Sequence, residues 1–350
     1  MAYASGTVTG RDDLWDKLLS FLTTNPALVA ANQAWEIVWS HDETNMSRRT
    51  LKGKGLSGLD EIYVSLEKQD GPHFAGEPIL WVGGSTGVSP TAQVIIDHPG
   101  SLTRYPAMFL DIAPMSYWFV ANGRRFVVVV RISTVYNMIY GGLFLPYATP
   151  TTYTYPLFVG GCRGFSQGGS IAEVRTWRAP ESLQYSGFIR PYADSGTSSY
   201  WFDPSAALLD PMGEWRGVAS GAAKPQYGLN AWMSPNKQQE SLQGVAINMP
   251  TWPGSTSSAM YQGVGYRSVM ERTIEGFSGE VPITPLTLFS SGISGNPENP
   301  TIYGILDGCY QAGGLSLTAE STFDVEGVEH IIFQNIMRTD VSSYWALALE

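Results

Sequence analysis

Hydrophobic and polar residues alternate along several short stretches of this chain. The segments AWEIVWS (34–40) and EIYVSLEK (61–68) place apolar side chains at every second position. A period of two with one more polar face indicates antiparallel strands that pack one face on a core. Short apolar runs predict further strands at 79–82, 93–97 and 136–145.

A helical period is clear near the start of the chain. In GRDDLWDKLLSFLTTNP (10–26), apolar residues recur every three to four positions, and two aspartates occupy the first turn, where they complement the helix dipole. Asn25-Pro26 ends this helix and starts a short second one, with Asn25 as its cap and Pro26 at its first position.

The most apolar stretch is YWFVANGRRFVVVVRISTVYNMIYGG (117–142). A membrane-spanning helix needs about 20 predominantly apolar residues with few charges, and three arginines interrupt this run. Asn122-Gly123 favours the type I′ turn of a β-hairpin, so we predict two buried strands here and no membrane insertion.

These elements predict an α+β fold that is predominantly antiparallel β, with N-terminal helices packed on a β-sheet or sandwich. Residues 1–161 would form the first domain. Residues 162–299 are rich in Gly, Ser, Pro, Asn and Trp, and indicate a loop-rich β region that is either a second domain or a set of loops from the first. Strands within 300–350 are expected to return to the first sheet and complete it. Their predicted positions are 303–306, 327–337 and 343–349.

Charge and composition narrow the range of functions that this chain could have. The net charge is −10 and no basic run occurs, which argues against nucleic acid as a partner. Only 15% of residues are charged, as is common in proteins that bury much of their surface in an assembly, and a heavily decorated single domain is the alternative explanation. The first residues lack the basic and apolar segments of a signal peptide, so we expect the protein to be made in a cytosol.

No motif in the sequence makes a strong case for catalysis. Ser166 lies in a Gly-x-Ser-x-Gly pattern, but the residues after it are a poor helix start, so a hydrolase is our third hypothesis. Neither the histidines nor the two cysteines have metal-site spacing, and we expect no cofactor. Asp203, Asp210 and Glu214 lie among aromatic residues, as in sugar-binding clefts, although turn acids beside core aromatics are the commoner explanation.

Four long stretches carry a family resemblance. They are DLWDKLLSFLTTNPALVAANQAWEIVW (13–39), LKGKGLSGLDEIYVSLE (51–67), SYWFVANGRRFVVVVRISTVYNMIYGGLFLPYATPTTYTYPLFVGG (116–161) and EHIIFQNIMRTDVSSYWALALE (329–350). Together they resemble a group of virion structural proteins of tailed bacteriophages, which occur among tail and baseplate components. The resemblance thins out over 162–299.

This resemblance implies a non-enzymatic part of the virion, assembled in the host cytoplasm and present in several symmetric copies as a homo-oligomer. We expect it at the tail tip or baseplate, where it would attach fibres or other peripheral proteins. A neck, collar or capsid position stays open. The small polar residues 2–10 would form an arm that orders against a neighbouring subunit.

Aromatic and arginine side chains dominate interface energies, although such residues are more often core residues than interface residues. The candidate interface residues are Trp118, Arg124, Arg125, Tyr147, Tyr153 and Tyr155. The alternative function is a host-receptor or glycan-binding module, with Trp201 and Trp215 in the binding surface.

Overall fold

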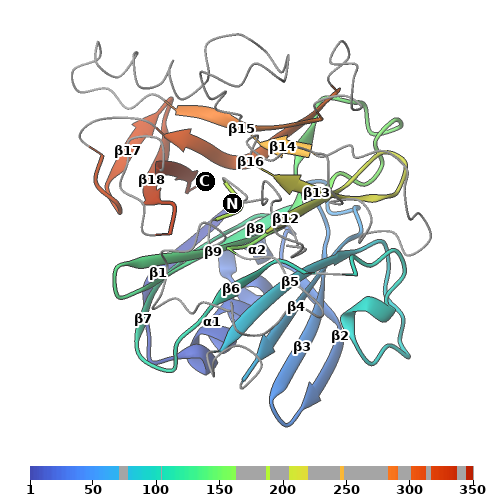
Figure 1. Ribbon diagram of the computed structural model, residues 1–350, viewed down its shortest axis with the longest axis horizontal. Helices are drawn as coiled ribbons and strands as arrows, with labels where there is room; N and C mark the ends of the chain where they lie inside the picture. The colour runs from blue at the N-terminus through green and yellow to red at the C-terminus, as the bar shows by residue number, and fades with distance from the viewer. Residues whose placement is uncertain are drawn as a thin grey trace, which may run out of the picture.

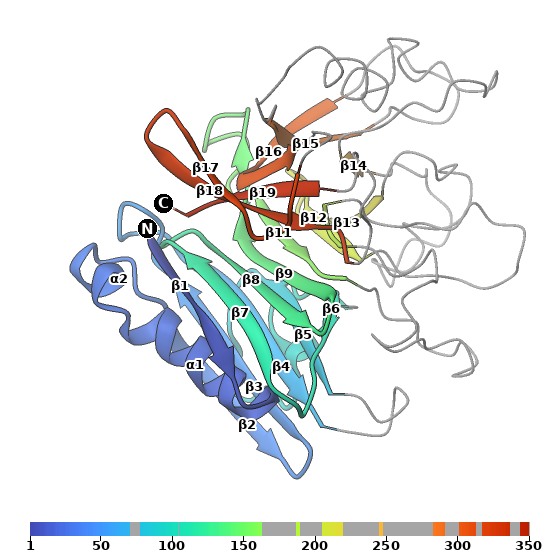
Figure 2. The same cartoon turned by 90° about the vertical axis from the view of Figure 1, so that its left-hand side faces the viewer.

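The computed structural model describes residues 1–70, 78–103, 105–162, 187–189, 205–219, 245–247, 283–290, 301–312, 317–336 and 344–349. Within these residues the chain forms two mostly antiparallel sheets that stack on each other, with the helices beside them (Figures 1 and 2). The described part of the chain is therefore mostly β, and its two α-helices lie in the N-terminal segment. None of the described helices is long and apolar enough to cross a membrane.

The predicted helices are present. Helix α1 spans Arg11–Thr24 and α2 spans Pro26–Ala30. The Asn25 side chain accepts a hydrogen bond from the Ala27 N–H at 2.9 Å, which confirms its role as the cap. The buried face of α1 packs beside the edge of the larger sheet, where the Phe21 ring lies 5.5 Å from the Phe119 ring.

The smaller sheet has five strands in chain order. These are β2 (Glu36–Glu43), β3 (Met46–Gly53), β4 (Ile62–Gln69), β5 (Ile79–Ser85) and β6 (Ala107–Phe109). The strand predictions at 34–40, 61–68 and 79–82 are confirmed as β2, β4 and β5. The prediction of a strand at 93–97 is wrong. That segment contains a 3-10 turn, η1 (Ile95–Asp97), because the Asp97 carboxylate accepts the N–H groups of Gln93 and Val94.

The larger sheet includes both ends of the described chain. Its strands follow the order β1 (Ala2–Val8), β7 (Met115–Ala121), β8 (Arg125–Ile132), β9 (Val135–Leu143), β11 (Leu157–Gly160), β12 (Ala206–Leu209), β13 (Trp215–Ala219), β14 (Val245–Ile247), β15 (Ile283–Ser290), β16 (Thr301–Ala312), β19 (Tyr344–Ala348), β18 (Val328–Gln334) and β17 (Thr322–Val325). A short strand β10 (Leu145–Pro146) pairs with β16. Most of 162–299 lies outside the described residues, so its division into a separate domain stays a prediction.

Two local expectations about the larger sheet are wrong. Residues 2–10 are no free arm, because β1 pairs along its whole length with β7 of the same chain. The β7–β8 hairpin is present, but neither Asn122 nor Gly123 has a positive φ, so the turn is not type I′. The Asn122 side chain instead accepts the N–H groups of Arg124 and Arg125, at 2.8 and 3.0 Å.

The C-terminal strands fold back over the first strands of the same sheet, so that the two chain ends lie side by side (Figures 1 and 2). The Tyr136 N–H donates to the Ile336 carbonyl at 2.9 Å. The Phe333 ring lies in the core, 5.2 Å from the Trp118 ring. The Glu320 carboxylate accepts hydrogen bonds from Arg131 and from the Tyr136 hydroxyl. These contacts join the last strands to β7–β9.

Candidate interaction surface at one end of the sandwich

The hairpin turn 122–124 organises one end of the molecule. The Trp35 indole N–H donates to the Asn122 carbonyl at 2.9 Å, and the Gln33 side chain accepts the Gly123 N–H. The Leu143 N–H donates to the Arg124 carbonyl, which joins the end of β9 to the turn. The turn is therefore fixed from both the helical segment and the larger sheet.

The loop 54–60, between β3 and β4, packs on this turn. The Gly55 N–H donates to the Gly123 carbonyl at 2.8 Å, and Gly55 has a φ of +69°, a conformation that favours glycine. Gly58 packs against the Asn32 side chain at the end of α2. These contacts hold the backbone of the loop in place. The loop exposes 86% of the surface of Leu59 and about half of the surface of Leu56 to solvent.

A second exposed apolar pair lies where β10 meets β16. The Tyr147 N–H donates to the Tyr303 carbonyl, and Tyr147 is 65% exposed beside Ile302, which is also exposed. The segment after α2, loop 54–60 and β16 each contact the hairpin turn, through Gln33, Gly55 and Asp307. We give the name apolar end to the exposed apolar residues on or next to these segments. It consists of Val29, Leu56, Leu59, Tyr147 and Ile302. Large apolar side chains that are exposed on ordered segments make this end a candidate interaction surface.

The six candidate interface residues divide into two groups of three. Trp118, Arg125 and Tyr153 are buried within this chain. The Tyr153 hydroxyl donates to the Leu209 carbonyl, and burial raises the pKa of this hydroxyl. Trp118 and Tyr153 contribute to the core, and all three side chains are covered by other parts of this chain.

The other three candidates all lie at or beside the apolar end. Tyr147 belongs to it, and Arg124 is in the hairpin turn with a side chain that is a quarter exposed. Tyr155 is half-buried, and burial together with the nearby Glu61 carboxylate raises its pKa. That proximity places Tyr155 next to the segment that follows loop 54–60.

Sequence reasoning missed the leucines of loop 54–60 and Asp307 on β16. The loop has a usable signal, since two leucines stand in a segment of glycine and charged residues where apolar side chains are unexpected. Asp307 has no such signal, because its contacts with Arg124 and Arg125 cross more than 180 residues of sequence.

The residues of the alternative functions are not assembled into a binding cleft in the described structure. Trp215 is buried, and its indole N–H donates to the Gly100 carbonyl at 2.9 Å, so a sugar cannot stack on it without displacing it from the core. Asp210 and Glu214 both pair with Arg216 in a tight turn. Trp201, Asp203 and the hydrolase candidate Ser166 lie outside the described residues.

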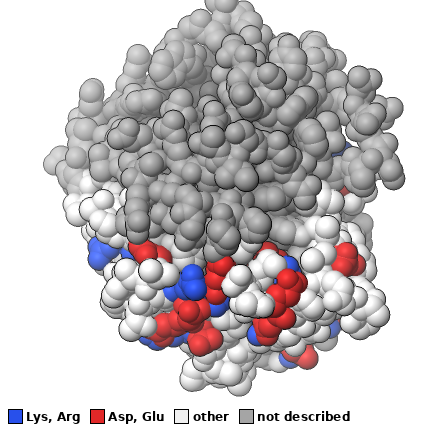
Figure 3. Space-filling view, turned by 60° about the horizontal axis from the view of Figure 1, so that its bottom comes forward, with Lys and Arg blue, Asp and Glu red and all other residues white. Residues whose placement is uncertain are grey.

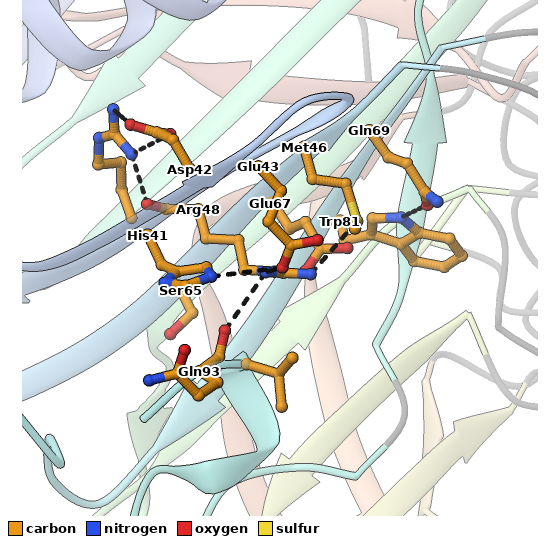
Figure 4. A network of polar contacts seen from close by, with 12 residues as sticks. His41, Asp42, Glu43, Met46, Arg48, Ser65, Glu67, Gln69, Trp81 and Gln93 are labelled. Atoms are coloured by element: carbon orange, nitrogen blue, oxygen red, sulfur yellow. Dashed lines mark hydrogen bonds and ion pairs between the residues drawn. The ribbon is translucent and has the colours of Figure 1, made fainter. Parts of the chain in front are cut away.

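The densest polar network lies on the smaller sheet, around Arg48 (Figure 4). This buried guanidinium donates to Glu67 at 2.6 Å and to Glu43 at 2.5 Å, and it also reaches the Gln93 carbonyl. The hydrogen bond from Arg48 is the main cause that lowers the pKa of Glu43. On the face shown in Figure 3, acidic and basic side chains are interspersed. We interpret this network as structural, because each of these carboxylates is paired with the buried Arg48 guanidinium.

A buried histidine links this sheet to the turn after β5. The Ser89 N–H donates to His98 Nδ1 at 3.2 Å, which leaves Nε2 to donate to the Thr50 hydroxyl at 2.9 Å. Thr50 in turn bonds Ser65 at 2.8 Å. Burial lowers the pKa of His98, and the ring is held as a neutral donor. This is the wrong arrangement for a general base acting on either hydroxyl.

No group of three or more His, Cys, Asp or Glu side chains within the described ranges could hold a metal ion. Both cysteines are buried, and burial raises the pKa of each thiol to about 12, so neither is a reactive thiolate near neutral pH. Comparison with known proteins finds no matching family model and no matching curated sequence.

Proposed function

We propose that this chain is a non-enzymatic structural component of a tailed-phage virion, at the tail tip or baseplate, where it attaches fibres or other peripheral proteins. In this proposal it is present in several symmetric copies. The sequence resemblance over 1–161 and the last fifty residues supports the virion role. The observation that carries the assembly role is the apolar end.

The apolar end has the composition expected of an interface. Its five large apolar side chains stand on segments fixed by backbone hydrogen bonds, so little conformational entropy is lost when a partner covers them. Arg124 and Tyr155 lie beside these apolar residues, and arginine and tyrosine are enriched at interface hot spots. A partner that covers this end would remove from water the apolar surface that the isolated chain exposes.

The proposal assigns different tasks to different parts of the chain. Residues 1–161 with 300–350 would form the framework that docks to the particle through the apolar end. Residues 162–299, whose composition is loop-rich, would add strands β12–β15 to this framework and display their remaining residues on the particle. A receptor- or glycan-binding role would then depend on this displayed region.

The test is incorporation into particles. We expect Leu59→Glu to reduce the amount of this chain in purified particles at least tenfold, because a charge in the centre of an interface costs more than about 1.4 kcal/mol. The matched control is Ile112→Glu. Ile112 is also exposed, at 70%, but lies beside the first residues of α1, and the 14-residue helix separates it by about 20 Å from α2.

Both variants change one exposed apolar residue to glutamate, so they should fold equally well, which circular dichroism and thermal unfolding would check. Equal incorporation of the two variants at wild-type level would refute the apolar end as the docking surface. Absence of the wild-type chain from particles would refute the virion role itself.

A further inference from the structure

Arg125, at the start of β8, is a fully enclosed cation with few partners. Its exposed fraction is 0%. Its Nε lies 3.5 Å from Asp307 Oδ2, and its Nη2 contacts the Met1 sulfur at 3.4 Å. Its Nε and Nη1 have no hydrogen-bond acceptor among the described residues. A guanidinium that is enclosed in this way normally directs its N–H groups at acceptors.

Within the described ranges, the carboxylate that pairs with Arg125 is that of Asp307, and it is shared. Arg124 Nη2 lies 3.0 Å from the same oxygen of Asp307, and the Asn122 amide nitrogen lies 3.3 Å from it. Three side chains therefore converge on a single oxygen atom. Arg124 Nε also has no acceptor among the described residues. Two positive charges thus face one negative charge at this place.

The chain itself shows how a buried arginine is otherwise compensated. Arg48 is almost as enclosed as Arg125, and it has two carboxylates of its own, Glu43 and Glu67, with a backbone carbonyl as a further acceptor. Arg216 likewise has two carboxylates. By this comparison the described residues around the Arg124–Arg125 pair supply one negatively charged acceptor too few.

We propose that Arg124 and Arg125 form a binding site for a carboxylate supplied from outside the chain. A carboxylate offers two oxygens in the plane that guanidinium N–H groups recognise, and three guanidinium nitrogens of the pair have no acceptor among the described residues. The site is approached along Arg124, whose side chain is a quarter exposed, and past Met1, which is 42% exposed and lies on Arg125 Nη2.

The carboxylate has two sources with the same chemistry, a small anion in solution or an acidic side chain of a second protein molecule. The site goes beyond the proposed virion role and does not depend on it.

The experiment measures thermal unfolding of the full chain in sodium acetate and in sodium chloride at equal ionic strength, at a concentration where sedimentation shows a monomer. Acetate is the probe, and acetamide is its neutral counterpart. We expect acetate to raise Tm by about 2 °C relative to chloride when it is present well above its Kd, and acetamide to have no such effect.

The variants assign the effect to the site. The acetate shift should vanish in Arg125→Met, and also in Arg124→Gln, which changes a more exposed residue if the first variant fails to fold. It should persist in Arg216→Gln, a matched control elsewhere in the sheet. The proposal is overturned if acetate and chloride give the same Tm in the wild-type chain, or if the shift survives in both Arg124→Gln and Arg125→Met.

Sedimentation at higher protein concentration distinguishes the two sources. If a second copy supplies the carboxylate, the chain self-associates and acetate dissociates it by competition. If the chain stays monomeric while acetate still raises Tm, the ligand is a free anion. Both results support the site.

Discussion

Phe333 offers the sharpest test of how the C-terminal strands are held. Its ring is fully buried and its centroid lies 5.2 Å from that of Trp118, 5.4 Å from that of Trp345 and 5.9 Å from that of Tyr136. Trp118 and Tyr136 belong to β7 and β9, whereas Trp345 belongs to β19. The ring therefore joins strands that are about 200 residues apart in sequence.

Truncation of a buried phenylalanine costs about 3–5 kcal/mol, from lost burial and from the cavity left behind. We expect Phe333→Ala to lower the free energy of unfolding by this amount. Phe333→Leu keeps most of the volume and loses the aromatic contacts, each worth about 0.5–1.5 kcal/mol, so its cost should be smaller. Because the total free energy of unfolding of a native protein is about 5–15 kcal/mol, both variants should still fold.

Urea unfolding followed by tryptophan fluorescence and by circular dichroism measures these losses. The two signals should change together, because the last strands and β7–β9 share one core. Phe323→Ala is the matched control. Phe323 lies half-buried on the outermost strand β17 and its loss should cost about 1 kcal/mol. A cost below about 1 kcal/mol for Phe333→Ala, or a separate early transition, would show that the C-terminal strands are not packed on β7–β9 as described.

Two further predictions concern single side chains. Burial lowers the pKa of His98 below the unfolded value of about 6.5. The contribution of neutral His98 to stability is therefore complete above about pH 6.5 and is lost as pH falls through the folded pKa, by at most about 1.4 kcal/mol per pH unit. Urea unfolding at pH 7.5 and 5.5 should show a smaller pH dependence of stability in His98→Gln than in the wild-type chain, and an unchanged pH dependence would contradict this. Gly308 has a φ of +69°, and a Cβ there would lie 2.1 Å from Arg125 Nη2. Gly308→Ala should therefore lower Tm more than Gly327→Ala, which has a similar φ of +86° but open space around it, and equal losses would show that Arg125 is not packed there.

Sequence patterns predicted the elements whose signals are local. The helix over 10–26 and the strand at 61–68 carry clear periodicity, the strand at 79–82 is a continuous apolar run, and the structure confirms all three. Strand β3 was missed because Arg48, which looks like a surface charge, is buried between Glu43 and Glu67 and disguises the inward face. Likewise the Asn122 side chain, and not a positive φ, decides the form of the hairpin turn.

The candidate surface was predictable only in part, because exposure depends on packing between distant segments. Tyr153 and Tyr155 are two residues apart, yet only Tyr153 is covered by β12 through its bond to Leu209. Arg124 and Arg125 are adjacent and both reach Asp307, but Arg124 lies in the turn with a quarter of its side chain exposed, whereas Arg125 at the start of β8 is enclosed against Asp307 and Gly308. No local pattern contains this information.

The position of this chain in a cryo-EM map of the intact particle tests the central proposal most directly. The proposal predicts density in a symmetric ring at the tail tip or baseplate, with the apolar end of residues 29, 56, 59, 147 and 302 covered by a neighbouring subunit. Density in which that end faces solvent in every copy would contradict the proposed docking surface. Absence of the chain from the particle would contradict the virion role.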